Sequence, residues 1–154
     1  MVKYAKANPG TLKFGSTGVG TSTHLSSETI NAAAGIKAIH VPYRGVAPAM
    51  NNLAGGHVDY VIAGSTAAIP SIQNGLHKAL AITSRTRSQA VPQVPTLMEQ
   101  GVPAETGSWY GLLVPAGTPP DIVKRLHAAM VVALKSPEVV ERHGVRIIGY
   151  ANAV

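Results

Sequence analysis

Residues 13–24 read KFGSTGVGTSTH, the most informative part of the chain. Its first residues predict a short strand over residues 12–15, and the glycines and hydroxyl side chains that follow predict a turn. A helix is expected over residues 22–34, with Ser22 as N-cap and Gly35 as the terminating residue. Free N–H groups at a helix start, with the positive end of the helix dipole, attract an anion. The stretch therefore predicts a seat for a carboxylate, sulfate or phosphate.

Short apolar segments alternate with helical segments along the rest of the chain. Further strands are predicted at residues 38–41, 60–63, 79–82, 110–114 and 146–148. Further helices are predicted over residues 2–7, from about Pro48 to residue 54, over 67–73, and over the shorter segment 136–144. Strands that alternate with helices favour parallel pairing with right-handed crossovers. We therefore predict an α/β fold with a mainly parallel sheet flanked by helices.

The clearest helix signal lies near the C-terminus. Residues 118–121, TPPD, offer the Thr118 hydroxyl as N-cap, two prolines for the first turn and an acid at the third position. Apolar residues then recur at helical spacing, at Val123, Leu126, Met130 and residues 133–134. By contrast, residues 85–107 show no clear period and predict mostly loop.

Composition and charge limit the function classes. Hydrophobic residues make up 45% of the 154 residues and charged residues 13%, as in a globular chain, and there is no cysteine for a disulfide or thiolate site. No apolar run approaches the roughly 20 residues that cross a bilayer. The net charge of +6 suits an anionic ligand. The basic residues are spread along the chain without interleaved aromatic residues, so nucleic acid is not the expected partner.

Candidate binding residues follow the predicted strands. Ligands of parallel α/β sheets bind beyond the carboxyl ends of the strands, and three connections leave such ends here, at residues 16–21, 42–47 and 64–66. The predicted ligand-binding residues on and beside them are Ser16, Thr17, Gly18, Gly20, Thr21, Ser22, Tyr43, Arg44, Gly64 and Ser65. Hydroxyls at helix starts also cap helices without any ligand, and that interpretation fits each connection taken alone. The first connection with the preceding Gly15 favours a ligand, because capping does not need the three glycines found here, Gly15, Gly18 and Gly20.

Patterns of catalytic and cofactor sites are missing. The first connection lacks the third glycine and the following acid of a dinucleotide site, and no Gly-Lys-Ser/Thr phosphate loop occurs, although a mononucleotide phosphate stays open. The six histidines show no metal-ligand spacing, and no nucleophile elbow or catalytic carboxylate pair is present. His24 is interpreted as a structural hydrogen-bonding residue. The sequence therefore predicts no enzyme, no cofactor and no metal.

Several motifs together resemble a known family. They are residues 5–10 (AKANPG), the loop 15–25, residues 40–45 (HVPYRG) with 47–49 (APA), residues 55–59 (GGHVD), 81–84 (AITS), 94–96 (VPT) and 109–119 (WYGLLVPAGTP). In this order they resemble the Bug family, the extracytoplasmic solute-binding receptors of tripartite tricarboxylate transporters, over nearly the whole chain. The resemblance implies one lobe of a type II periplasmic-binding-protein fold that closes on a small carboxylate.

The resemblance also implies how the chain is organised. Residues 1–108 correspond to the carboxylate-binding second lobe, and residues 109–154 to a return strand and helices that pack on the first lobe in full-length relatives. The first lobe and the signal peptide have no counterpart in these residues, so we expect a truncated receptor. Where many members carry Asp-Asn after the third strand, this chain has Ala63-Gly64, which favours a ligand without an amine.

Partners and alternatives follow from the same resemblance. A small carboxylate, membrane transporter subunits and a periplasmic location are implied for the whole receptor. Without a first lobe, the segment 110–114 and the helix 120–135 are left with exposed apolar faces, so we expect self-association through the C-terminal segment or docking on another lobe. The alternative function is a truncated remnant that acts as an oligomerising or interaction module without transporting a ligand.

Overall fold

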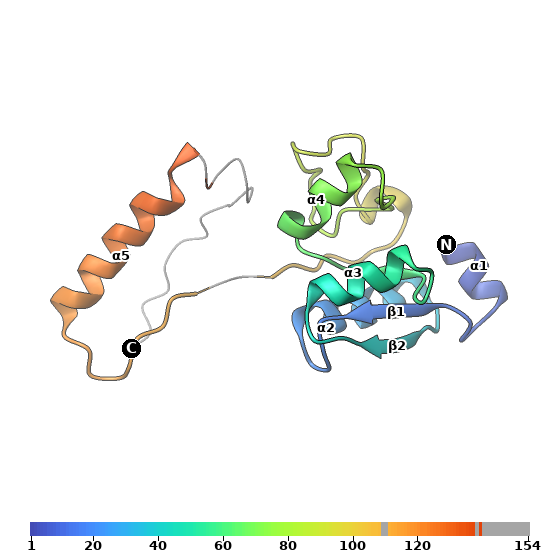
Figure 1. The fold of residues 1–154 in the computed structure, drawn as a ribbon, viewed down its shortest axis with the longest axis horizontal. Coiled ribbons are helices and arrows are strands. Elements are labelled where there is room, and N and C mark those ends of the chain that lie inside the picture. Colours follow the sequence, from blue (N-terminus) through green and yellow to red (C-terminus); the bar gives the residue numbers. More distant parts are fainter. Residues whose placement is uncertain (109–110, 138, 140–154) are drawn as a thin grey trace. The chain divides into compact units, whose positions relative to one another are not determined.

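The computed structural model describes residues 1–108, 111–137 and 139. The chain divides into two compact units, Met1–Ser108 and Trp109–Val154, here called unit 1 and unit 2 (Figure 1). The sheet and four of the helices belong to unit 1, and the long C-terminal helix belongs to unit 2. The assignment of the units to the second lobe and the return segment of the family fold stays a prediction.

A small parallel sheet forms the centre of unit 1. Its strands are β1 (Lys13–Ser16), β2 (Ile39–Pro42) and β3 (Tyr60–Val61), in the order β2-β1-β3. Both pairs are parallel, with Phe14 opposite His40 on one side and opposite Tyr60 on the other. The predicted α/β fold with a parallel sheet is thereby confirmed.

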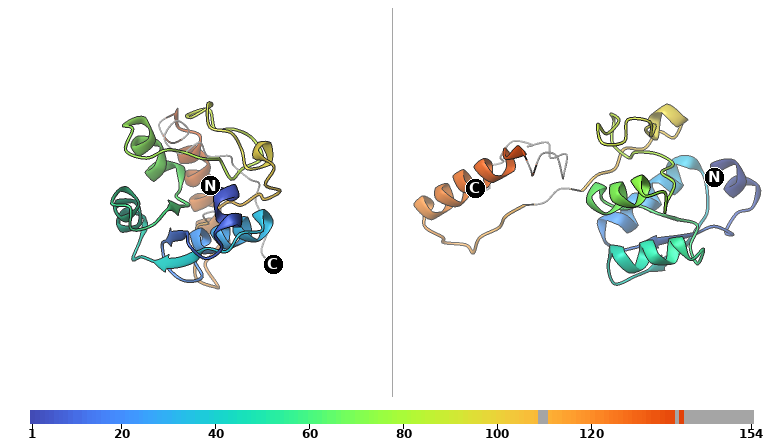
Figure 2. Two further views of the ribbon diagram at one scale, coloured as in Figure 1. Left: turned by 90° about the vertical axis from the view of Figure 1, so that its right-hand side faces the viewer. Right: turned by 45° about the horizontal axis from the view of Figure 1, so that its top comes forward.

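Helices cover both faces of this sheet. The helices of unit 1 are α1 (Val2–Ala7), α2 (Ser22–Ala34), α3 (Val46–Ala54) and α4 (Ser65–Gln73), followed by a 3-10 turn, η1 (Met98–Gln100), and it is α2 and α3 that pack on the strands. Because β2 and β3 flank β1 on opposite sides, right-handed crossovers bring α2 and α3 to opposite faces. The views in Figure 2 show the strands between these two helices. This arrangement is the doubly wound pattern typical of ligand-binding α/β sheets.

The core lies between the sheet and α2. Phe14 is fully buried in the central strand, and Tyr60 stands beside it from β3. Helix α2 contributes Ile30 and Ala34, and Ala5 of α1 closes the layer with no exposed surface. The helix ends where the sequence predicts, since Gly35 takes the left-handed conformation at φ 63° and its N–H bonds the carbonyl of Ala32.

The predicted strand at residues 79–82 does not form. Only Ile82 makes a bridge, to Thr96, with the Ile82 N–H on the Pro95 carbonyl at 2.8 Å. The opposing segment contains Pro92 and Pro95, which have no N–H to donate, so the ladder cannot extend. The strand therefore fails because of the segment that it pairs with. The sequence of residues 79–82 does not show which segment that is.

Helix starts differ from the predicted ones by a few residues. Thr21 rather than Ser22 is the N-cap of α2, and its side chain makes no capping bond. Helices α3 and α4 begin at Val46 and Ser65, each two residues before the predicted start. Such shifts are usual for element boundaries.

Unit 2 contains α5 (Pro120–Leu134), which confirms the predicted late helix. Its N-cap is Pro119, and the Thr118 hydroxyl donates instead to the Pro115 carbonyl at 2.8 Å, so the predicted role of Thr118 was wrong. Residues 111–114 form no strand, because no segment of the described chain pairs with them. The predicted strand at 146–148 and most of the predicted helix at 136–144 lie outside the described residues, as does Tyr110.

Gly15 occupies a crowded point on the α3 face of the sheet. A Cβ atom there would lie 3.0 Å from Val61 Cγ2 and 3.2 Å from Tyr43 Cε2. We predict that Gly15→Ala lowers the free energy of unfolding, because overpacking costs about 1–3 kcal/mol. Restricting the unfolded chain returns only about 0.4–1 kcal/mol. Urea unfolding measures the difference, and Gly107→Ala, which has open space around it, is the control expected to show only this small gain.

Tyr60 supports the core through its hydroxyl, which donates to Asn31 Oδ1 at 2.6 Å. The Asn31 Nδ2 atom already has no partner in the described chain, so Tyr60→Phe leaves this buried amide with neither bond. We predict a loss of roughly 1–3 kcal/mol in unfolding free energy at neutral pH, measured by urea unfolding. The exposed Tyr4 offers the matched control, Tyr4→Phe.

The same side chain sets an alkaline limit on stability. Burial raises the pKa of Tyr60 to about 12, from an ordinary value of 10.0. Between these values the unfolded chain loses the proton while the folded chain keeps it, so stability falls as pH rises through this window. Tyr60→Phe should flatten that part of the profile, and an unchanged slope in the variant would contradict this assignment.

Candidate functional site

Three strand-to-helix connections meet at the carboxyl edge of the sheet. β1, β2 and β3 are parallel and end at Ser16, Pro42 and Val61, and helices α2, α3 and α4 begin after connections of three to five residues. Their N-terminal turns therefore lie at one edge (Figure 1). The ten residues predicted from the sequence all lie in or directly beside these connections.

The first connection, residues 17–21, is a tight loop shaped by two glycines. Gly18 and Gly20 have φ values of 135° and 77°, a region that side chains with a Cβ rarely adopt. The Thr21 hydroxyl donates to the Gly18 carbonyl at 2.8 Å and closes the loop. The positive φ values explain why glycine occurs at these two positions. From the sequence alone, this reason could not be distinguished from close contact with a ligand.

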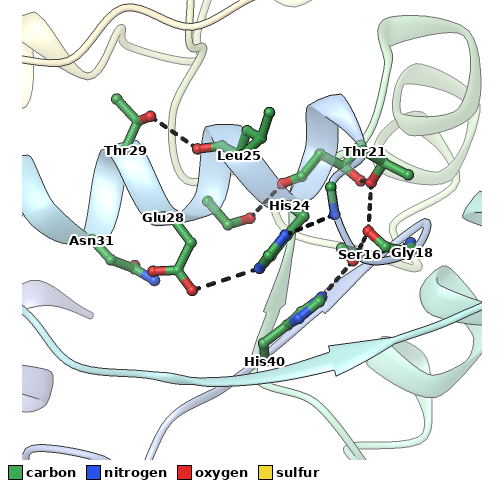
Figure 3. Close-up of polar contacts among 12 residues, drawn as sticks. Ser16, Gly18, Thr21, His24, Leu25, Glu28, Thr29, Asn31 and His40 are labelled. Carbon is green, nitrogen blue, oxygen red and sulfur yellow. Dashed lines mark hydrogen bonds and ion pairs between the residues drawn. The ribbon is translucent and has the colours of Figure 1, made fainter.

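Three loop amides that the sequence analysis left free are used inside the protein. The Thr17 N–H donates to Thr23 Oγ1 at 2.9 Å, and the Gly18 N–H donates to Ser16 Oγ at 3.1 Å. The Gly20 N–H donates to His24 Nδ1 at 3.1 Å (Figure 3). Ser16 is fully buried, so its hydroxyl supports the loop from beneath and is not offered to solvent.

The first turn of α2 keeps its donors. The N–H groups of Ser22, Thr23 and His24 donate no hydrogen bond within the described residues, and the Ser22 side chain is exposed. Four such orphan N–H groups are normal at a helix start and are satisfied by caps, water or ligands. Thr21 makes no side-chain cap, so these N–H groups stay unbonded within the described residues. Of the donors that the sequence analysis offered to an anion, those at the start of α2 are the ones left.

Two histidines support this loop from the α2 side of the sheet. The His24 ring stacks on the His40 ring with centroids 3.9 Å apart, and His40 stacks in turn on Phe14 at 4.9 Å. His40 Nε2 lies 2.6 Å from Ser16 Oγ (Figure 3). Burial lowers the pKa of His40, and the nearby His24 lowers it further, so a neutral His40 is favoured. The neutral ring fits its place between aromatic neighbours.

The second connection brings Tyr43 and Arg44 to the same edge. The Tyr43 N–H donates to the Ser16 carbonyl at 2.9 Å, which extends the pairing of β1 and β2, and its ring packs over Gly15. Arg44 is exposed, and its guanidinium has no hydrogen bond or ion pair within the described chain. A positive charge without an internal partner is thus available beside the sheet edge.

The third connection is only loosely joined to the first. The Gly64 carbonyl accepts the Ala67 and Ala68 N–H groups at 3.0 Å, so Gly64 is the N-cap of α4. Ser65 is exposed at the first position of the helix. No hydrogen bond links Gly64 or Ser65 to residues 17–21 in the part of the chain that the structure describes. They share the edge with the other candidates without a hydrogen bond to them in the described residues.

Thr23, His24 and His40 matter to the site but were not among the predicted binding residues. Thr23 Oγ1 receives the Thr17 N–H and lies 2.9 Å and 3.1 Å from the Thr17 and Thr21 hydroxyls. His40 could not be found from sequence, because its place beside Phe14 depends on the register of two separate strands. The Gly20–His24 spacing of four residues is the one signal that was available.

Other kinds of site find less support. Within the described residues, no group of three His, Cys, Asp or Glu side chains is arranged to hold a metal, and no helix has the length and apolarity to span a membrane. A hollow of about 290 Å³ lies between α1, the C-terminal half of α2 and the later loops. Its lining is mainly apolar, with Ile30, Leu80 and Val102 among its residues, so it does not suit an anion.

Comparison with known proteins places this geometry in a family. The model of the tripartite tricarboxylate transporter family receptor, TctC, matches residues 1–145. A protein from Pseudomonas sp. strain P51, described as the UPF0065 protein in the tcbD-tcbE intergenic region, is 40% identical over 159 residues, covering 100% of this chain and 47% of that protein. The chain thus spans about half the length of the relatives it matches.

Two solved structures show the same fold. "R. palustris Rpa4515 with adipate" has a TM-score of 0.85 and 34% identity, and "MatC (Rpa3494) from Rhodopseudomonas palustris with bound malate" has a TM-score of 0.83 and 34% identity. Each comparison covers 92% of this chain and 48% of the other. The family match, the sequence identity and the shared fold lead to one conclusion: the chain belongs to the TctC, or Bug, family of tripartite tricarboxylate transporter receptors.

Proposed function

We propose that this chain forms the carboxylate-holding part of a solute-binding receptor. The observation that carries the proposal is the set of unpaired N–H groups at the start of α2, at Ser22, Thr23 and His24. They lie at the edge of the sheet where ligands of parallel α/β folds bind. An N-terminal turn favours negative charge through both its N–H groups and its dipole.

Neighbouring groups complete the proposed contact. The exposed Ser22 hydroxyl is a donor beside these amides, and the unpaired guanidinium of Arg44 supplies positive charge from the second connection. Gly64 and Ser65 add a second helix start at the same edge. Ser16, Thr17, Gly18, Gly20, Thr21 and Tyr43 act in this proposal mainly by shaping and supporting the loop.

A small dicarboxylate is the favoured ligand. Solved relatives carry adipate and malate, according to their descriptions, and both have two carboxylates on a short carbon chain. One carboxylate would use the amides at the α2 start, which leaves the other for a donor elsewhere. In this proposal Ala63-Gly64, which offers no acid after β3, disfavours an amino group on the ligand.

The wider role of the whole receptor is part of the proposal. Members of this family are solute-binding receptors and not enzymes. We infer that the full receptor delivers its carboxylate to membrane transporter subunits from the periplasm. Because this chain spans about half of its relatives, the first lobe of the family fold would supply the remaining contacts to the ligand.

Replacing Ser22 by proline tests the amide contact. Proline is accepted at the first helical position, and Thr21 before it has the extended conformation that proline requires, with φ −71° and ψ 163°. Ser22→Pro therefore removes one N–H without breaking the helix. A hydrogen bond to a charged group contributes about 1.5–3 kcal/mol, so adipate affinity should fall on the order of 10- to 100-fold, measured by isothermal titration calorimetry.

The control for this experiment is Ser22→Ala, which removes the hydroxyl but keeps the N–H. A smaller loss in this variant assigns the main effect to the backbone. In the unchanged chain, adipate or malate should raise the melting temperature, since a ligand that binds only the folded state stabilises it. If neither acid raises the melting temperature or gives a heat of binding, the proposed function is wrong.

A second candidate function is assembly without ligand transport, and α5 favours it. None of the residues of α5 is buried, and the Leu126 side chain is 39% exposed. Val123, Leu126, Met130 and Leu134 share one side of the helix by their spacing. An apolar face of this kind typically marks an interaction surface, here for a second copy or another lobe.

Light scattering distinguishes a monomeric chain from one that assembles through α5. We expect the isolated chain to exceed the monomer mass as its concentration rises, because pairing would bury the exposed side of α5. Leu126→Glu should shift the chain toward monomer, while Ala128→Glu, with the same added charge on the opposite side of the helix, should not. A monomer at every concentration would contradict the assembly proposal.

A further inference from the structure

One amide of the loop is held by a histidine side chain. The Gly20 N–H donates to His24 Nδ1 at 3.1 Å, whereas the amides of Thr17 and Gly18 are bonded to hydroxyls. Because Nδ1 acts as the acceptor, the hydrogen bond assigns the neutral tautomer with its proton on Nε2. Histidine is the side chain whose charge changes most readily between pH 5 and 8.

We propose that neutral His24 withholds the Gly20 amide from the ligand, and that protonation of His24 releases it, so that carboxylate binding strengthens as pH falls. The inference rests on the proposed function, because it concerns the same seat. It adds His24 to the site as a pH-sensitive positioning residue and gives the sign of the effect.

The chemistry of the Gly20–His24 pair determines this sign. Once Nδ1 carries a proton, it can no longer accept the Gly20 N–H, and two donors face each other across a short distance. A carboxylate oxygen can accept from both. The imidazolium also adds a positive charge to the helix start that the proposal assigns to the anion. By linkage, carboxylate binding must favour the protonated ring by the same factor.

The groups around His24 allow this change. Glu28, one turn along α2, has Oε1 at 3.8 Å from His24 Nε2, so a protonated ring keeps a partner for its other nitrogen. His40 of β2 stacks on the opposite side at 3.9 Å, and Phe14 of β1 lies beyond it. Tyr60 of β3 stacks on Phe14 and stays protonated in this range, because burial raises its pKa to about 12.

In this arrangement His40 supports the loop through Ser16, whereas His24 controls the Gly20 amide. Burial and the neighbouring His24 lower the pKa of His40 from its ordinary 6.5, so His40 stays neutral as pH falls toward that value. It therefore keeps its contact with the Ser16 hydroxyl, 2.6 Å away, and the loop keeps its support from beneath. Release is then confined to the Gly20 amide.

Adipate binding at two pH values tests the proposal on the full chain. Calorimetry at about pH 8 and about pH 6, which bracket histidine titration, should show affinity for the unchanged chain rising roughly 5-fold or more at the lower pH. His24→Asn keeps an acceptor, Oδ1, near the position of Nδ1 but cannot be protonated. Whatever its absolute affinity, this variant should bind adipate equally well at the two pH values. Protonation of adipate itself affects both proteins equally.

His57→Asn is the matched control, since His57 is exposed before β3 at the opposite edge of the sheet and should keep the pH profile. A second readout needs no ligand. In ¹H–¹⁵N spectra, the Gly20 amide signal should move with the same midpoint as the ring protons of His24, and it should stop moving in His24→Asn.

The outcomes separate this inference from the proposed function. Adipate binding with a flat pH profile, or with a profile that His24→Asn retains, overturns the inference and leaves the proposed function standing. A Gly20 signal that ignores His24 titration also overturns it. Absence of adipate and malate binding at both pH values overturns the proposed function, and the pH-dependent binding claimed here falls with it.

Discussion

Parallel pairing of three short strands sets the arrangement of unit 1 and of its candidate site. The Ile39 and Tyr43 N–H groups bond the Leu12 and Ser16 carbonyls on one side of β1, and the Asp59 N–H bonds the Lys13 carbonyl on the other. Because all three strands run the same way, each returning helix must start at the same edge. The site is therefore a consequence of strand direction before any side chain is considered.

Stacked aromatic side chains and Ser16 support the loop of residues 17–21 and keep it in one shape. The rings of Phe14, His40 and Tyr60 lie in register across three strands, and His24 from α2 stacks on His40. Ser16 connects this layer to the loop through its contacts with His40 and Gly18. A loop with so many internal bonds holds one shape, and a site that is already shaped loses less freedom when a ligand binds.

In the proposed site, some backbone N–H groups are bonded within the protein and others are left for the ligand. Amides deep in the loop are bonded to hydroxyls or to His24, while those in the first turn of α2 have no partner in the described residues. Such a half-used set of donors suits a ligand with a small charged end. In the receptor that we propose, the first lobe of the family fold would cover the opposite side of that ligand, which agrees with a chain about half the length of its relatives.

Sequence patterns alone were enough to predict several local elements and the family of this protein. Glycines and hydroxyls after a strand marked the loop, Gly35 ended α2, and two prolines with an acid marked the start of α5, because these features act within a few residues. These patterns did not determine which neighbours meet. The failed strand at 79–82, the burial of Ser16 and the stacking of His24 on His40 were decided only by tertiary structure. Pairing, burial and stacking depend on residues far apart in the chain. The local sequence pattern does not specify how such distant segments align with one another.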